Sequence, residues 1–215
     1  MPLRAADASR RSRRSAAPLP AKFYDRDTEQ VARGLLGAVV RCTTASGVAS
    51  GRIVETEAYL GEHDLACHAT AGRTQRTRWL YGAPGTAYVY FIYGVHWCFN
   101  AVTRSIGEPS AVLVRALEPM SGVALMRERR GNVRDRDLTN GPGKLCEALG
   151  ITGALNGMPL RRSAVELLRG EEIPDSRVVI TPRIGITKSA DWPLRWYVSD
   201  NPYVSKTPKH PRPAT

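Results

Sequence analysis

The sequence has few cysteines and no long apolar run, and each absence excludes a class of protein. Four cysteines are scattered over 215 residues, with no C-x-x-C pair. A disulfide framework is therefore not expected, and a reducing cytosol suits the chain. No apolar run approaches the roughly 20 residues that a membrane-spanning helix needs. Small disulfide-rich proteins and membrane-spanning proteins are thus excluded as classes.

Lysine is also scarce, although the chain is strongly basic. The formal net charge is +11 and the sequence pI is about 10.0. The lysines occur only at Lys22, Lys144, Lys188, Lys206 and Lys209, so arginine carries most of the positive charge. Because a guanidinium binds phosphate bidentately, this bias favours a nucleic-acid partner. A generally basic protein from an arginine-rich, GC-biased genome is the alternative.

Differences in composition divide the chain into three parts. Residues 1–20 hold five arginines and one acid without an apolar segment, and they predict a disordered basic arm. Residues 21–205 predict one domain, since hydrophobic residues make up 42% of the chain. Residues 206–215 are proline-rich and predict a flexible tail. A monomer is expected.

Secondary-structure signals are mixed along the domain and do not follow a regular βαβ alternation. Helices are predicted over 24–37, 121–131 and 140–150, and strands over 38–44, 50–59, 86–103, 110–119, 176–187 and 193–200. Gly94 marks a turn within the long aromatic stretch 86–103. The pattern predicts an α+β fold with a curved, mostly antiparallel mixed sheet, surrounding helices and a protruding β-hairpin.

Charged side chains occur where a buried strand is predicted. On a strand, alternate residues share a face, so Glu55, Glu57 and Tyr59 point the same way. Arg115 stands alone among apolar neighbours on a later strand and needs a partner if it is buried. A glutamate on the neighbouring strand would supply that partner.

Each of these residues also has an ordinary structural interpretation. Tyr90 and Tyr93 could belong to the core or the sheet surface, and His68 could be a hydrogen-bonded structural histidine. Arg115 could form only a structural ion pair, and Glu57 could be a solvated strand residue. Together, however, a carboxylate, several tyrosines, a histidine and a lone arginine predict an aromatic pocket with one acid–base group. On a basic protein, such a pocket suits an enzyme that extracts a base from DNA.

Five ordered blocks carry a resemblance to a known family. They are "RIVETEAYLG", the histidine at 68, "PGTAYVYFIYGVHWCFN", "VLVRALEP" and "NGPGKLCEALG". The chain resembles the alkyladenine (3-methyladenine) DNA glycosylases, and the similarity runs from "AKFYDRDTEQVARGLLG" to "PLRWYVSDNPYVS". The resemblance implies a protein that flips alkylated or deaminated purines out of duplex DNA and hydrolyses the N-glycosidic bond.

The resemblance also implies roles for individual residues. Glu57 matches the general base that activates water, and Arg115 matches the arginine beside it. The flipped base would lie between Tyr59, His68 and Tyr90. Tyr93 matches the side chain inserted into the duplex. Two further matches are Asn100, which discriminates against the amino group of guanine, and the carbonyl of Ile184, which contacts the water.

Other expectations concern DNA binding and the type of chemistry. No lysine lies between 51 and 118, so a Schiff-base nucleophile is not expected and the enzyme should be monofunctional. No cofactor and no metal are expected. Candidate phosphate contacts are Arg73, Arg76, Arg78 and Lys144, the last near a helix N-terminus. The protein is predicted to be cytoplasmic, in a bacterium, and associated with the nucleoid.

The chain departs from the family pattern at Gln75, Thr77 and His96, which changes the edge of the pocket and the hairpin. Two rival classes remain open. One is a non-catalytic module that binds lesions or nucleic acid. The other is a metal-dependent nuclease that uses Glu55, Glu57, His63 and Cys67, although their spacing fits no standard metal site.

Overall fold

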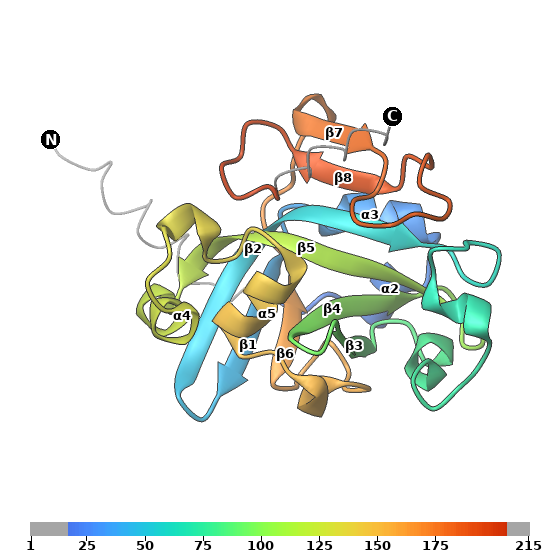
Figure 1. Ribbon diagram of the computed structural model, residues 1–215, viewed down its shortest axis with the longest axis horizontal. Helices are drawn as coiled ribbons and strands as arrows, with labels where there is room; N and C mark the ends of the chain where they lie inside the picture. The colour runs from blue at the N-terminus through green and yellow to red at the C-terminus, as the bar shows by residue number, and fades with distance from the viewer. Residues whose placement is uncertain (1–16, 206–215) are drawn as a thin grey trace, which may run out of the picture.

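An eight-stranded sheet forms the body of the protein (Figure 1). The structure is a computed structural model that describes residues 17–205. Six strands follow the order β3-β4-β5-β2-β1-β6, while β8 pairs with β2 and β7 with β8. Every pairing between these strands is antiparallel. The α+β prediction with a mostly antiparallel sheet is therefore confirmed.

The strands differ greatly in length. They are β1 (Val39–Thr44), β2 (Gly47–Tyr59), β3 (Ala87–Ile92), β4 (His96–Thr103), β5 (Ser110–Ser121), β6 (Val165–Leu168), β7 (Val178–Thr181) and β8 (Arg195–Val198). β2 and β5 are the longest and lie side by side at the centre of the sheet. Residues 111–117 of β5 are apolar except for Arg115, and residues 53–58 of β2 are buried, which suits strands that are covered on both faces.

In the described part of the chain, four short α-helices and several 3-10 turns surround the sheet. The α-helices are α2 (Ala21–Tyr24), α3 (Thr28–Leu35), α4 (Val123–Arg130) and α5 (Pro142–Leu149). The 3-10 turns are η1 (His68–Ala71), η2 (Arg78–Tyr81), η3 (Asp135–Asp137), η4 (Gly153–Leu155) and η5 (Asp175–Arg177). Figure 1 shows α5 in front of the sheet and α3 behind it. Both helices thus bury apolar faces against the same central strands.

The end of β2 is enclosed on both edges. Residues Glu55 to Glu57 pair with β8 on one side and with β5 on the other. The register between β2 and β5 shifts on each side of Glu55, which marks a bulge there. Bulges re-aim side chains and are frequent next to functional sites. This enclosure explains how two carboxylates come to be buried in a sheet.

Three details of the elements differ from the prediction. β5 continues through Pro119, because Pro119 stands beside a register shift opposite Gly51, where a ladder hydrogen bond is not required. β6 was missed, since four residues show too little periodicity to be recognised. The helix predicted over 24–37 is interrupted, since α2 ends at Tyr24 and α3 begins only at Thr28.

The ends of the chain lie mostly outside the described residues. The predicted tail 206–215 and positions 1–16 of the predicted arm belong to this group. The last part of the arm contacts the sheet: Pro18 forms a bridge with Leu168, and the amide of Leu19 donates to the carbonyl of Leu167 over 2.8 Å. Among residues 17–205, no helix is both long and apolar enough to cross a membrane.

Candidate active site

Two glutamates and two arginines form a buried ionic cluster at the end of β2. Arg115 Nη1 lies 3.1 Å from Glu57 Oε2, and Arg115 Nε lies 3.3 Å from Glu55 Oε1. Glu55 Oε1 also accepts a 2.6 Å hydrogen bond from Arg195 Nε. Both glutamates are completely buried. The prediction that Arg115 pairs with a glutamate of a neighbouring strand is confirmed.

Three donors hold the carboxylate of Glu57. Its Oε1 accepts a 2.7 Å hydrogen bond from the amide of Ile184, and its Oε2 accepts one of 2.9 Å from the hydroxyl of Tyr59 and one from Arg115. The sequence prediction concerned the carbonyl of Ile184, whereas the observed contact to Glu57 is made by its amide. An ionised carboxylate offers about four acceptor positions, so about one is left for a water molecule.

Burial and charge set the ionisation of the groups around Glu57. Burial, with a smaller contribution from the charge of Glu57, raises the pKa of Tyr59 well above its usual value. Burial alone would lower the pKa of Arg115, but the carboxylates of Glu57 and Glu55 outweigh it and raise that pKa. Tyr59 therefore remains a hydrogen-bond donor and Arg115 remains a cation at neutral pH.

An aromatic wall faces this cluster. The rings of His68 and Tyr90 lie 4.4 Å apart between centroids and are inclined at 65°, and those of Tyr88 and Tyr90 lie 5.3 Å apart. His68 Nδ1 lies 2.9 Å from the hydroxyl of Tyr88. Burial, together with the nearby charge of Arg76, lowers the pKa of His68 below 6.5. The wall is therefore uncharged at neutral pH.

A cavity of about 290 Å³ lies between the wall and the ionic cluster. Seven of the residues proposed from the sequence line it: Tyr59, His68, Tyr90, Tyr93, Asn100, Arg115 and Ile184. Glu57 lies directly behind this lining, joined to it by its three donors. The sequence thus predicted most of one continuous pocket, although its residues come from β2 through the segment after β7.

Asn100 lies on β4 and lines this cavity. Its Nδ2 donates a 3.0 Å hydrogen bond to the carbonyl of Tyr88, and the residue is 3% exposed. This bond fixes the plane of the side-chain amide, so its remaining polar edge has a defined direction beside the cavity. Such an edge is able to select a ligand by the hydrogen bonds that the ligand offers.

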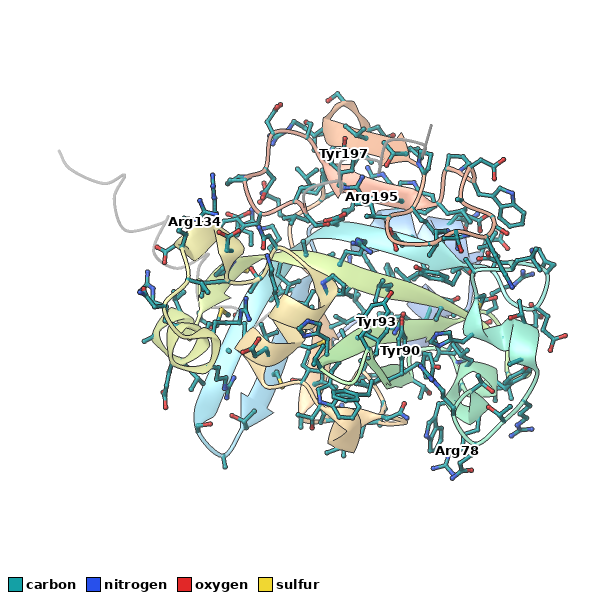
Figure 2. All side chains as sticks on the ribbon, in the orientation of Figure 1. Arg78, Tyr90, Tyr93, Arg134, Arg195 and Tyr197 are labelled. Atoms are coloured by element: carbon teal, nitrogen blue, oxygen red, sulfur yellow. The ribbon has the colours of Figure 1, made fainter. Side chains whose placement is uncertain are left out.

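Tyr93 stands at the tip of the hairpin between β3 and β4. Its side chain is 82% exposed. Tyr93 and Gly94 both have positive φ, 54° and 68°, and the amide of Val95 donates back to the carbonyl of Ile92 over 3.2 Å. Positive φ at a bulky residue costs about 1–3 kcal/mol and is concentrated at functional positions. Figure 2 shows Tyr93 beside Tyr90 at the centre of the face viewed.

The predicted phosphate contacts lie outside the lining of the cavity, and Arg76 stacks on one lining residue, Tyr90. Arg73, Arg76 and Arg78 are exposed, and each guanidinium lies over an aromatic ring, at 5.9, 5.7 and 5.0 Å from the centroids. Figure 2 shows Arg78 at the lower edge of the same face. Lys144, in the first turn of α5, donates to Asn140 Oδ1 over 2.7 Å. We call Arg73, Arg76 and Arg78 the rim arginines.

The rim arginines differ from the arginines of α4 and the loop after it. Arg127 is paired with Asp135 at 2.9 Å, Arg130 with Glu147, and Arg134 with Asp137 at 2.8 Å. No rim arginine forms a salt bridge with the part of the chain that the structure describes. Their charges are therefore available to an anionic ligand.

The metal-nuclease alternative does not suit this geometry. Glu55 and Glu57, two of its proposed ligands, are surrounded by arginine donors rather than by further metal-binding groups. Within residues 17–205, no group of three or more His, Cys, Asp or Glu residues is arranged to hold a metal ion. The carboxylates are thus held as hydrogen-bond acceptors.

Several residues of the site were not recognised from the sequence. Tyr88 is one of them, and its alternation with Tyr90 along β3 was the available signal. Three charged residues are buried in or beside irregular segments, and no sequence pattern predicts their burial: they are Asp64, Arg183 and Arg195. Their positions depend on contacts that span most of the chain.

Comparison with known proteins agrees with the arrangement of the pocket. Residues 22–202 match the model of the family described as methylpurine-DNA glycosylase (MPG). The chain therefore belongs to the methylpurine-DNA glycosylase family. This confirms the resemblance noted in the sequence.

Relatives in distant microbes cover almost the whole chain. A protein of Methanoculleus marisnigri is 49% identical over 195 residues, which are 87% of this chain and 98% of the relative. One of Chlorobaculum parvum is 47% identical over 190 residues, with 88% and 91% covered, and one of Rhodopseudomonas palustris is 48% identical over 184 residues, with 86% of both covered. Each carries the name "Putative 3-methyladenine DNA glycosylase".

Proposed function

We propose that the protein is a monofunctional DNA glycosylase. It flips alkylated or deaminated purines out of duplex DNA and hydrolyses their N-glycosidic bonds, which starts base excision repair. The observation that carries the proposal is the buried carboxylate of Glu57, held by three donors directly behind an aromatic cavity. Family membership and the names of the relatives support the same reaction.

The cavity supports binding of a planar base. Extruding a nucleotide costs a few kcal/mol of unstacking and unpairing, and least for a damaged or mispaired base. Stacking on aromatic side chains returns about 1–3 kcal/mol per base. In this role, the base lies between Tyr59 on one side and His68 and Tyr90 on the other. Asn100 rejects guanine, because its fixed amide edge opposes the exocyclic amine.

The carboxylate of Glu57 performs the chemistry in this proposal. An N-glycosidic bond breaks through a positively charged sugar, as in glycoside hydrolysis. Glu57 stabilises that charge and takes the proton of the attacking water, for which about one acceptor position remains. Arg115 and the Ile184 amide keep the carboxylate oriented. Purines alkylated at N3 or N7 are already cationic, so they leave without being protonated first.

Strand cleavage is not part of the proposed activity. A glycosylase that cuts the strand forms a Schiff base through an amine, and no lysine lies among the residues that line the cavity. Lys144, two residues from Pro142 of the lining, is bonded to Asn140. Water is therefore the nucleophile, and the product is an abasic site in an intact strand.

Duplex DNA is the proposed partner, bound by one molecule of the protein. Tyr93 enters the space that the flipped base leaves, since it is exposed on the strained hairpin tip. The rim arginines and Lys144 contact phosphates on the two sides of the cavity. We place the protein in the cytoplasm of a bacterium, at the nucleoid.

Base release from defined duplexes tests the proposal. Duplexes that contain 3-methyladenine, 7-methylguanine, hypoxanthine or ethenoadenine should lose the damaged base in the presence of EDTA and keep an intact strand until alkali is added. Binding of these duplexes without base release would instead support the alternative function, a non-catalytic lesion-binding protein. Activity that disappears in EDTA would contradict the metal-independent mechanism.

A further inference from the structure

A second buried ion pair lies next to the catalytic cluster. Arg183 and Asp64 are joined by two hydrogen bonds, 2.5 Å from Nη1 to Oδ2 and 2.8 Å from Nη2 to Oδ1, and both side chains are completely buried. Asp64 also accepts the amides of Leu60 and Ala66, each over 3.1 Å. Burial would raise the pKa of Asp64, but these donors outweigh it and lower that pKa. The pair is therefore fully charged.

Removing two charges from water is costly, so such a pair is weak evidence for stability alone. Its place in the fold indicates a more specific role. Asp64 lies in the loop that leads from β2 to His68, and its carbonyl accepts the amide of Cys67 over 2.7 Å. Arg183 directly precedes Ile184, whose amide binds Glu57. The ion pair thus joins the loop of the aromatic wall to the segment that holds the general base.

Arg183 also reaches the end of β2 itself. Its Nη1 donates a 2.9 Å hydrogen bond to the carbonyl of Ala58, the residue between Glu57 and Tyr59. Its guanidinium lies 4.7 Å from the ring centroid of Tyr59. Arg183 is 5% exposed and does not line the cavity, so it covers the side of the ring that is turned away from the cavity.

We propose that Arg183, oriented by Asp64, is a positioning residue of this site. It supports the Tyr59 ring from behind and, through Ala58 and Ile184, sets the place of the Glu57 carboxylate. It does not touch the base. This inference rests on the proposed glycosylase function, since it assigns a residue to that reaction.

The geometry makes arginine necessary at this position. A lysine keeps the charge, but it has no planar fork and cannot bind Asp64 bidentately, reach Ala58 and cover the Tyr59 ring at once. A displacement of about 1 Å at a catalytic group can cost about 10²-fold in rate. Substrate binding depends mainly on the rim arginines and on the wall of His68 and Tyr90. The proposal therefore predicts that a change at Arg183 lowers the rate of base release much more than the affinity for the duplex.

The variant Arg183→Lys tests this separation. Single-turnover base release from a hypoxanthine duplex at saturating protein should fall by about 10-fold to 10²-fold. The dissociation constant of the same duplex should change far less. The matched control is Arg41→Lys, because Arg41 forms a similar two-bond pair with Glu166, 3.1 and 2.5 Å long, between β1 and β6. Arg41 does not line the cavity, and its variant should keep the wild-type rate.

Thermal unfolding of both variants identifies a purely structural role. Arg183→Lys with a lower melting temperature but a wild-type rate would overturn the proposal, and so would an equal loss of rate in Arg41→Lys. If Arg183→Lys does not fold, Asp64→Asn gives the same comparison, since it keeps the size of the side chain and frees the arginine fork. A fall in rate supports the proposal and a wild-type rate overturns it. A wild-type protein that releases no base would contradict the proposed function instead.

Discussion

The two sides of the cavity are built in opposite ways. The ionic side holds Glu55, Glu57 and Arg115 in a network of hydrogen bonds that are 2.7 to 3.3 Å long. The aromatic side, His68, Tyr88 and Tyr90, is uncharged, and its rings lie at inclined rather than stacked angles. In the proposed function, the ionic side performs the chemistry and the aromatic side recognises the base.

The neutrality of the aromatic side has a physical consequence. Because the pKa of His68 is lowered, its ring does not repel a cationic alkylated base at neutral pH. On the opposite side, Arg115 and Arg195 balance the charges of the two glutamates. In the proposed function, a cationic base or sugar would be stacked by the rings and would lie near the carboxylate of Glu57.

The largest effect is expected from Glu57→Gln, which breaks the ionic side. Glutamine keeps the size of the side chain but cannot take a proton from water. Single-turnover base release should fall by about 10²–10⁴-fold, as is typical of a general base, while lesion affinity stays near the wild-type value.

The matched control is Glu108→Gln, because Glu108 is exposed and, among residues 17–205, is paired only with Arg104 at 2.7 Å. It should leave the rate unchanged. Glu55→Gln is not a neutral control, since Arg115 and Arg195 both depend on Glu55. Loss of binding together with activity in Glu57→Gln would mean that Glu57 is structural.

Tyr90→Ala breaks the aromatic side and should mainly affect affinity. Losing one stacking surface costs about 1–3 kcal/mol, so the dissociation constant of a lesion duplex should rise by about 5-fold to 150-fold. The control is Phe23→Ala, because the ring of Phe23 stacks with Arg26 and does not line the cavity. The dissociation constants of both variants are measured with a duplex that contains fluorescent ethenoadenine. An effect on rate with unchanged affinity would show that the two sides are not separate.

Tyr93→Gly tests the hairpin tip, which belongs to neither the ionic nor the aromatic side of the cavity. Glycine adopts positive φ without strain, so the melting temperature should not fall. The flipped state should become less populated by about fivefold to tenfold, the low end of the stacking range, because the gap in the duplex is no longer filled. A flipping equilibrium equal to that of the wild-type protein would show that Tyr93 does not fill the space left by the flipped base.

The smallest effects are expected at the rim arginines. Replacing Arg76 or Arg78 by alanine should flatten the log–log dependence of affinity on salt by about 0.9 per lost phosphate contact. Arg127→Ala should leave the slope unchanged, since Arg127 is bound to Asp135. The slopes come from titrations of one duplex at several salt concentrations. Equal slopes for all variants would place the phosphate contacts elsewhere.

Local patterns in the sequence determined a large part of this protein. Alternation along β2 put Glu55, Glu57 and Tyr59 on one face, and the lone Arg115 in an apolar strand required a carboxylate partner. Gly94 within a run of β-formers marked the hairpin that exposes Tyr93. These features follow from the two-residue period of a strand and from turn chemistry, which neighbouring residues alone set.

Only the tertiary structure decided which loops complete the site. Asp64 and Arg183 are 119 residues apart, and Arg183 lies beyond the end of β7 although a strand is predicted there, so no local pattern predicts their ion pair. The same holds for the Ile184 amide on Glu57 and for Arg195 on Glu55. Their contacts exist because β8 pairs with the end of β2 and carries the neighbouring loops to it. Pairing between distant strands depends on the whole chain, and for that reason it cannot be read from any one segment.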